Sequence, residues 1–139
     1  MSVNYKVTRV RNPKGIENVD YFANRVAKTS DYDFEQLATD INNSTTVTRA
    51  DALAVLNACQ PFIEKALLNG QAVVLAGLGR FQISIQGKCW PAETMQSDDF
   101  MPSSMIKGHK ILFRAEPKLK KSIATNLRYK RIAGEHDKA

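Results

Sequence analysis

The stretch that most constrains the fold of this chain is segment 70–81, which reads GQAVVLAGLGRF. A helix is predicted to stop at Gly70, because glycine reaches positive φ at no steric cost and commonly ends helices. The purely apolar run 72–76 predicts a short strand buried on both faces. Residues 77–79 predict a tight turn, and alternating polar and apolar residues over 80–86 predict a half-buried strand. A helix, a strand, a turn and a strand are thus encoded in direct succession.

Two helices are predicted before this segment. The polar run 30–33 supplies capping side chains for a helix that continues through residue 43. Thr48 and Asp51 form a variant capping box, with Asp in place of Glu. This box opens a long helix that runs to about Asn69.

The second helix is apolar on more than one face. One stripe contains Leu53, Leu56, Ile63 and Leu67, and the other contains Val55, Cys59, Phe62 and Ala66. A helix with two apolar faces needs two partners, and in a small chain we expect the second to be another copy of the protein. The expected dimer interface comprises Leu56, Cys59, Phe62, Ile63 and Phe81. Pro61 predicts a kink rather than a break, because the apolar spacing resumes immediately.

The two ends of the chain carry weaker signals. Alternation over residues 3–8 predicts a strand, whereas segment 19–27 fits both a helical stripe and a strand. Segment 87–108 has no repeated pattern. Residues 111–113 predict a third strand. Pro117 can occupy the first turn of a final helix, after which the polar tail is expected to fray.

Positive charge is concentrated at both ends of the sequence. The net charge is +6. Residues 1–14 contain four basic residues and no acidic residue, and residues 107–139 contain ten basic and three acidic residues. A polyanion is the natural partner for this distribution. The alternative is a protein with a lysine-rich, solvated tail.

The sequence offers no pattern typical of an enzyme or a metal centre. Cys59 and Cys89 have no metal-ligand spacing and are too few for a disulfide scaffold, so we interpret them as buried or incidental thiols. His109 and His136 lack ligands at suitable spacing. The Gly-x-Gly at 77–79 does not extend to a dinucleotide motif. We therefore expect no catalytic residue, metal, cofactor or small-molecule substrate.

Membrane and secretion signals are also missing from the sequence. The longest clean apolar stretch, 72–76, is too short to span a bilayer. The first ten residues lack the apolar region of a signal peptide. We therefore expect no membrane partner and a cytoplasmic location.

The pattern G-x-x-V-x-L-x-G-x-G-x-F over 70–81 resembles the centre of the bacterial HU and integration-host-factor family of histone-like DNA-binding proteins. The S/T-x-x-[DE]-A opening of the second helix is matched by Thr48, Asp51 and Ala52. The family's closing F-x-P-G-K-x-L-K is matched in part, at Phe113, Leu119 and Lys120. The resemblance covers about 34–127. With its added N-terminal strand, the chain is similar to a divergent HU-like subgroup that carries an N-terminal extension.

The resemblance implies an α+β fold. Two N-terminal helices, a three-stranded antiparallel sheet with a projecting β-arm and a short C-terminal helix are expected, plus an extra N-terminal strand. Because this leaves no additional helix, a strand is favoured for 19–27. The implied organisation is an N-terminal extension at 1–29, an HU-like DNA-binding domain at 30–127 and a basic flexible tail at 128–139. The implied function is architectural, largely sequence-nonspecific binding and condensation of duplex DNA by a homodimer in the nucleoid.

Basic side chains of the sheet and of the last third of the chain are the expected DNA-binding residues. They are Arg80, Lys88, Lys107, Lys110, Arg114, Lys118, Lys120 and Lys121. Lys110 and Arg114 share one strand face by alternation. The other three lysines open the final helix, where free N–H groups also favour an anion.

The expected arm departs from the family pattern. Family arms are rich in arginine and carry an Arg-Asn-Pro tip, whereas 87–109 contains no arginine but includes Asp98 and Asp99. Trp90 and Phe100 in this stretch fit either stacking on DNA or folding back against the sheet. We therefore keep a second hypothesis, a protein–protein adaptor whose acidic, aromatic arm contacts a partner instead of DNA.

Overall fold

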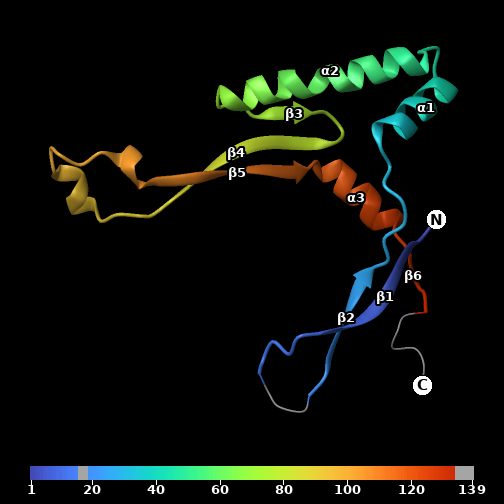
Figure 1. The fold of residues 1–139 in the computed structure, drawn as a ribbon, viewed down its shortest axis with the longest axis horizontal. Helices are drawn as coiled ribbons and strands as arrows, with labels where there is room; N and C mark the ends of the chain where they lie inside the picture. Colours follow the sequence, from blue (N-terminus) through green and yellow to red (C-terminus); the bar gives the residue numbers. More distant parts are fainter. Residues whose placement is uncertain (16–18, 134–139) are drawn as a thin grey trace. The chain divides into compact units, whose positions relative to one another are not determined.

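The computed structural model describes residues 1–15 and 19–133 (Figure 1). The chain divides into two compact units, which we call the central unit, Asp33–Lys120, and the terminal unit, Met1–Tyr32 with Lys121–Ala139. The described residues form three α-helices and two three-stranded sheets. The α+β class predicted from the sequence is therefore confirmed.

Two capped helices begin the central unit. They are α1, Phe34–Ser44, and α2, Arg49–Leu68. Asp33 Oδ1 accepts a hydrogen bond of 2.9 Å from the Gln36 N–H, and Thr48 Oγ1 accepts one of 3.2 Å from the Asp51 N–H. Each cap satisfies an N–H that has no partner inside its helix. Both predicted helix starts are confirmed, and α2 continues through Pro61.

Glycines end α2 and turn the following strand. Gly70 has φ of 74°, and its N–H donates to the Leu67 carbonyl at 3.0 Å. The Gln71 N–H donates to the Ala66 carbonyl, also at 3.0 Å, which completes a Schellman motif. Gly77 has φ of 80° in the turn. The predicted helix stop and tight turn are confirmed.

The sheet of the central unit is antiparallel, in the order β3-β4-β5. Its strands are β3, Val73–Leu75; β4, Gly79–Gly87; and β5, Ile106–Ala115. The predicted third strand is therefore longer than expected. The expectation that the first strand is buried on both faces is wrong, because β3 is an edge strand and the Val74 side chain is 67% exposed.

Strands β4 and β5 form a long hairpin that extends past the end of β3 (Figure 1). The connection at its far end contains two 3-10 helices, η1, Ala92–Gln96, and η2, Pro102–Met105. The rings of Trp90 and Phe100 lie 5.3 Å apart within it. These two aromatic rings contact each other, so the connection has its own small apolar cluster.

The sheet of the terminal unit has the order β2-β1-β6. Its strands are β1, Val3–Val10; β2, Tyr21–Val26; and β6, Tyr129–Arg131. Strand β1 pairs antiparallel with β2 and parallel with β6. The preference for a strand over 19–27 is confirmed at β2. Helix α3, Pro117–Asn126, runs from the central unit into the terminal unit.

Part of the expected fraying tail is ordered in a sheet. The Val3 N–H donates to the Arg128 carbonyl at 2.8 Å, and the Ile132 N–H donates to the Tyr5 carbonyl at 2.9 Å. These bonds flank β6, so the tail prediction is wrong for residues 129–131. The prediction for residues 134–139 lies outside the described residues.

Few large apolar side chains are covered. Among the described residues, the buried apolar residues are Ala38, Ala52 and Leu67. In contrast, Phe62 is 73% exposed and Leu68 is 76% exposed. The central unit therefore leaves much apolar surface in contact with water, which is costly for an isolated chain.

Candidate nucleic-acid interface

The β4–β5 hairpin has two chemically different faces. Residues directly opposite in an antiparallel pair project to the same face. Phe81 pairs with Phe113 and Ile83 with Ile111, so one face is apolar. The alternate positions form the other face, where Arg80 lies opposite Arg114 and Ser84 lies opposite Lys110.

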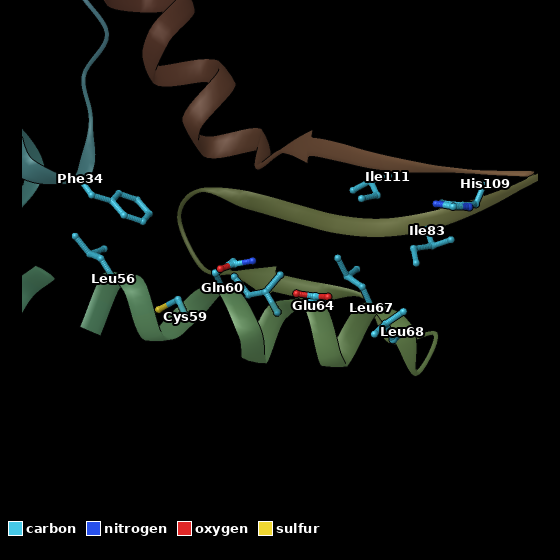
Figure 2. A pocket seen from close by; sticks show the side chains of 11 residues that line it. Phe34, Leu56, Cys59, Gln60, Glu64, Leu67, Leu68, Ile83, His109 and Ile111 are labelled. Atoms are coloured by element: carbon cyan, nitrogen blue, oxygen red, sulfur yellow. The ribbon is translucent and has the colours of Figure 1, made fainter. Parts of the chain in front are cut away.

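The apolar face and α2 together enclose a groove (Figure 2) of about 410 Å³. Its sheet side includes Ile83 and Ile111, and Phe34 contributes from the start of α1. Its helix side includes Leu56, Cys59, Ile63 and Leu67. Side chains from α2 and from the hairpin point toward one another across this groove. The first apolar stripe of α2 is thus directed at the sheet.

The second apolar stripe of α2 is largely uncovered. Val55 is 63% exposed and Phe62 is 73% exposed, and Cys59 is also exposed. Of the five residues expected in a dimer interface, Leu56, Cys59 and Ile63 line the groove, and Phe62 lies outside it.

The remaining expected interface residue, Phe81, contacts its strand partner. The rings of Phe81 and Phe113 have centroids 4.8 Å apart. Beside this pair, the β3–β4 turn approaches β5 so closely that a Cβ added to Gly79 would lie 2.4 Å from the Arg114 carbonyl oxygen. Glycine at this position allows the hairpin to pair up to its end.

On the opposite face, three of the predicted DNA-binding side chains line one hollow. Arg80 and Arg114 contribute from β4 and β5, and Lys120 contributes from the first turns of α3. The hollow has a volume of about 480 Å³. All three side chains are exposed, and none forms an ion pair with a described residue. We call this group the hairpin triad.

An acidic residue that the site prediction missed also lines this hollow. Glu116 directly precedes α3, and its Oε2 atom is buried and has no hydrogen-bond partner among the described residues. Its backbone N–H donates to the Leu78 carbonyl at 3.0 Å, which fixes the residue beside the β3–β4 turn. The sequence contained an indication of this residue, because Glu116 occupies the glycine position of the closing F-x-P-G-K-x-L-K motif that the chain resembles.

The other predicted basic residues are dispersed. Lys110 shares the face of the hairpin triad, farther along β5. Lys107 lies beside the register shift at Gly87, and Lys88 lies in the connection at the far end of the hairpin. These two lysines are separated from the hollow along the length of the hairpin.

The remaining two lysines lie on α3. Lys118 and Lys121 are three residues apart and therefore neighbours on one helix face. Lys120 is about 200° around the helix from Lys118 at 100° per residue. The three lysines therefore do not form one cluster, and only Lys120 lines the hollow.

Within the described residues, no three His, Cys, Asp or Glu side chains gather in a way that could hold a metal ion. None of the described helices combines the length and apolar character of a membrane span. Cys59 and Cys89 are free thiols and both are exposed, so the buried alternative for them is wrong.

A family model described as an HU domain fused to a wHTH, Ig or glycine-rich motif matches residues 1–131. A search among curated proteins found no match. The crystal structure of a Bacteroides vulgatus protein, proposed to be a bacterial DNA-binding protein, is similar with a TM-score of 0.61 and 15% identity. The alignment covers 100% of this chain and 52% of that one, so this chain spans about half its length. Anabaena HU in a cocrystal with DNA aligns with a TM-score of 0.49 and 21% identity, over 67% of this chain and 98% of that one.

Proposed function

Because the chain belongs to the HU-HIG family of HU-domain proteins, we propose that it binds duplex DNA as a homodimer. The proposed role is architectural, with little sequence preference, in the nucleoid and without enzymatic activity. The observation that carries the proposal is the hairpin triad, in which Arg80, Arg114 and Lys120 line one exposed hollow.

The electrostatics of the triad favour a polyanion. Arg80 and Arg114 are directly opposite in register, and like charges in such a pair repel each other. A phosphate backbone relieves this repulsion, and each neutralised phosphate releases counterions. Contacts to phosphates carry no direct sequence information, so the expected binding is largely nonspecific.

The proposed dimer follows from the exposed stripe of α2. Val55 and Phe62 remain uncovered in the single chain. A second copy would offer the same apolar stripe, which makes a self-complementary, two-fold symmetric interface the simplest way to cover both.

The test is a salt titration of binding to duplexes of unrelated sequence. Changing the triad to Arg80→Gln, Arg114→Gln and Lys120→Gln should weaken binding to all of them. The slope of log K against log salt should flatten by about 0.9 per lost contact, or up to about 2.7 in total. As a matched pair, Arg114→Gln should lower the slope, whereas Lys65→Gln on α2 should leave it unchanged. A wild-type slope in the folded triad variant would contradict the proposal.

A second candidate function is a protein–protein adaptor on the same scaffold. It is supported by the far end of the hairpin, where Trp90 contacts Phe100 and the stretch contains Glu93, Asp98 and Asp99. Acidic side chains repel phosphates, so this end is poorly suited to DNA. If Asp98→Asn with Asp99→Asn leaves DNA affinity unchanged at low salt, the far end does not approach DNA, and the adaptor function gains support.

A further inference from the structure

The sheet of the terminal unit also has two different faces. Lys6 on β1 lies directly opposite Arg25 on β2, and Asn4 lies opposite Lys130 on β6. Because directly opposite residues share a face and alternate residues of β1 do too, Lys6, Arg25 and Lys130 project to the same side. We call them the sheet triad. All three are exposed.

Among the described residues, no acidic strand neighbour compensates the charge on this side. The described strand residues that share the face of the sheet triad include no acidic residue. An ion pair of this unit, between Arg9 and Asp20, involves a residue of the other face, since Arg9 lies opposite Phe22. None of the three triad cations forms an ion pair with a described residue. The Lys6–Arg25 pair is again two like charges directly opposite each other.

We propose that the sheet triad is a second phosphate-binding surface of this protein, and that its partner is duplex DNA. The inference rests on the proposed function only in taking duplex DNA as the polyanion. The surface itself is built from different strands, in a different compact unit from the hairpin triad.

The spread of the cations favours a polymer over a small anion. Neighbouring strands lie about 4.8 Å apart, and two residues along a strand add about 6.6 Å. Lys130 is offset from Lys6 by two residues, because it lies opposite Asn4. The three cations therefore form a diagonal row about 12 Å long, more than one phosphate group can contact. Duplex DNA carries one negative charge per about 1.7 Å of its axis and supplies several phosphates over that distance.

The experiment uses four full-length proteins in a two-by-two design. They are the wild type, the hairpin-triad variant, a sheet-triad variant with Lys6→Gln, Arg25→Gln and Lys130→Gln, and the combination. Affinity for one random duplex is measured as a function of salt, and circular dichroism checks the fold of each protein. In the sheet-triad variant, the slope of log K against log salt should flatten by up to about 2.7, at about 0.9 per lost phosphate contact. The DNA affinity of the hairpin-triad variant should still depend on salt. This remaining salt dependence should disappear in the variant that combines both sets of substitutions.

A matched pair of single variants separates position from charge. Arg25→Gln and Arg9→Gln remove the same charge from the same sheet, but from opposite faces. Arg25→Gln should lower the slope by about 0.9, while Arg9→Gln should leave it unchanged. Arg25→Lys keeps the charge and should retain the wild-type slope, which also shows that a loss in Arg25→Gln does not come from misfolding.

The outcomes distinguish the two proposals. A wild-type slope in the folded sheet-triad variant, or equal losses in Arg9→Gln and Arg25→Gln, overturns the second surface and leaves the hairpin site standing. A loss confined to the sheet-triad variant supports the second surface and removes the hairpin site. Absence of duplex binding by the wild-type protein overturns both.

Discussion

Truncation of one exposed ring on α2 tests the proposed dimer. Phe62 is 73% exposed in the single chain, and fully burying a phenylalanine side chain stabilises by about 1.5–3 kcal/mol. About three quarters of that gain, roughly 1–2 kcal/mol, is therefore still available to an interface. In a two-fold symmetric dimer the ring is present twice, so Phe62→Ala should cost about 2–4 kcal/mol. The dimer dissociation constant should rise roughly 30- to 700-fold, at 1.4 kcal/mol per factor of ten.

Sedimentation equilibrium over a range of concentrations measures this constant directly. The control is Met101→Ala, which removes an apolar side chain that is 67% exposed but lies in the connection at the far end of the hairpin. It should leave the dissociation constant unchanged. A wild-type protein that stays monomeric and folded at micromolar concentration would refute the reasoning, as would a Phe62→Ala variant that dimerises as tightly as the wild type.

Two further substitutions test the hairpin and its hollow. Glu116→Gln removes the acidic charge beside the hairpin triad and keeps the side-chain size, so DNA affinity should rise by up to about fivefold, measured by titration at low salt; weaker binding would contradict this. Gly79→Ala places a Cβ 2.4 Å from the Arg114 carbonyl oxygen and should destabilise the fold by about 1–3 kcal/mol in urea denaturation. The control, Gly108→Ala, also adds a Cβ within the hairpin, but the nearest atom is the Gln86 side-chain oxygen at 4.0 Å, so this variant should unfold close to wild type. Equal stability of the two variants would disprove the steric argument.

The features that local chemistry determines were predictable from the sequence. The caps at Asp33 and Thr48 and the helix stop at Gly70 depend on residues within a few positions of one another. The presence of two apolar stripes on α2 was also predictable, because helical spacing fixes which side chains share a face. The alternation over β4 likewise predicted which of its residues share a face of the sheet.

Features that depend on distant partners were not predictable. An apolar run such as that of β3 indicates a strand but not its position in a sheet, so the exposure of Val74 could not be anticipated. The hollow of the hairpin triad also requires the register of β4 against β5. That register places Arg114 opposite Arg80 and brings Glu116 beside them, although the sequence separates Arg80 from Glu116 by more than thirty residues.

The distribution of charge on the surface depends on both the sequence and the fold. The sequence places basic residues at both ends of the chain, and it predicts a strand at one end and a fraying tail at the other. Parallel pairing of β6 with β1 instead makes the two ends neighbours in one sheet. Lys6 and Lys130 thereby project from the same face, together with Arg25. Folding thus converts two separate basic segments into one basic surface, and the cost of holding these like charges together is the physical reason to expect a polyanion there.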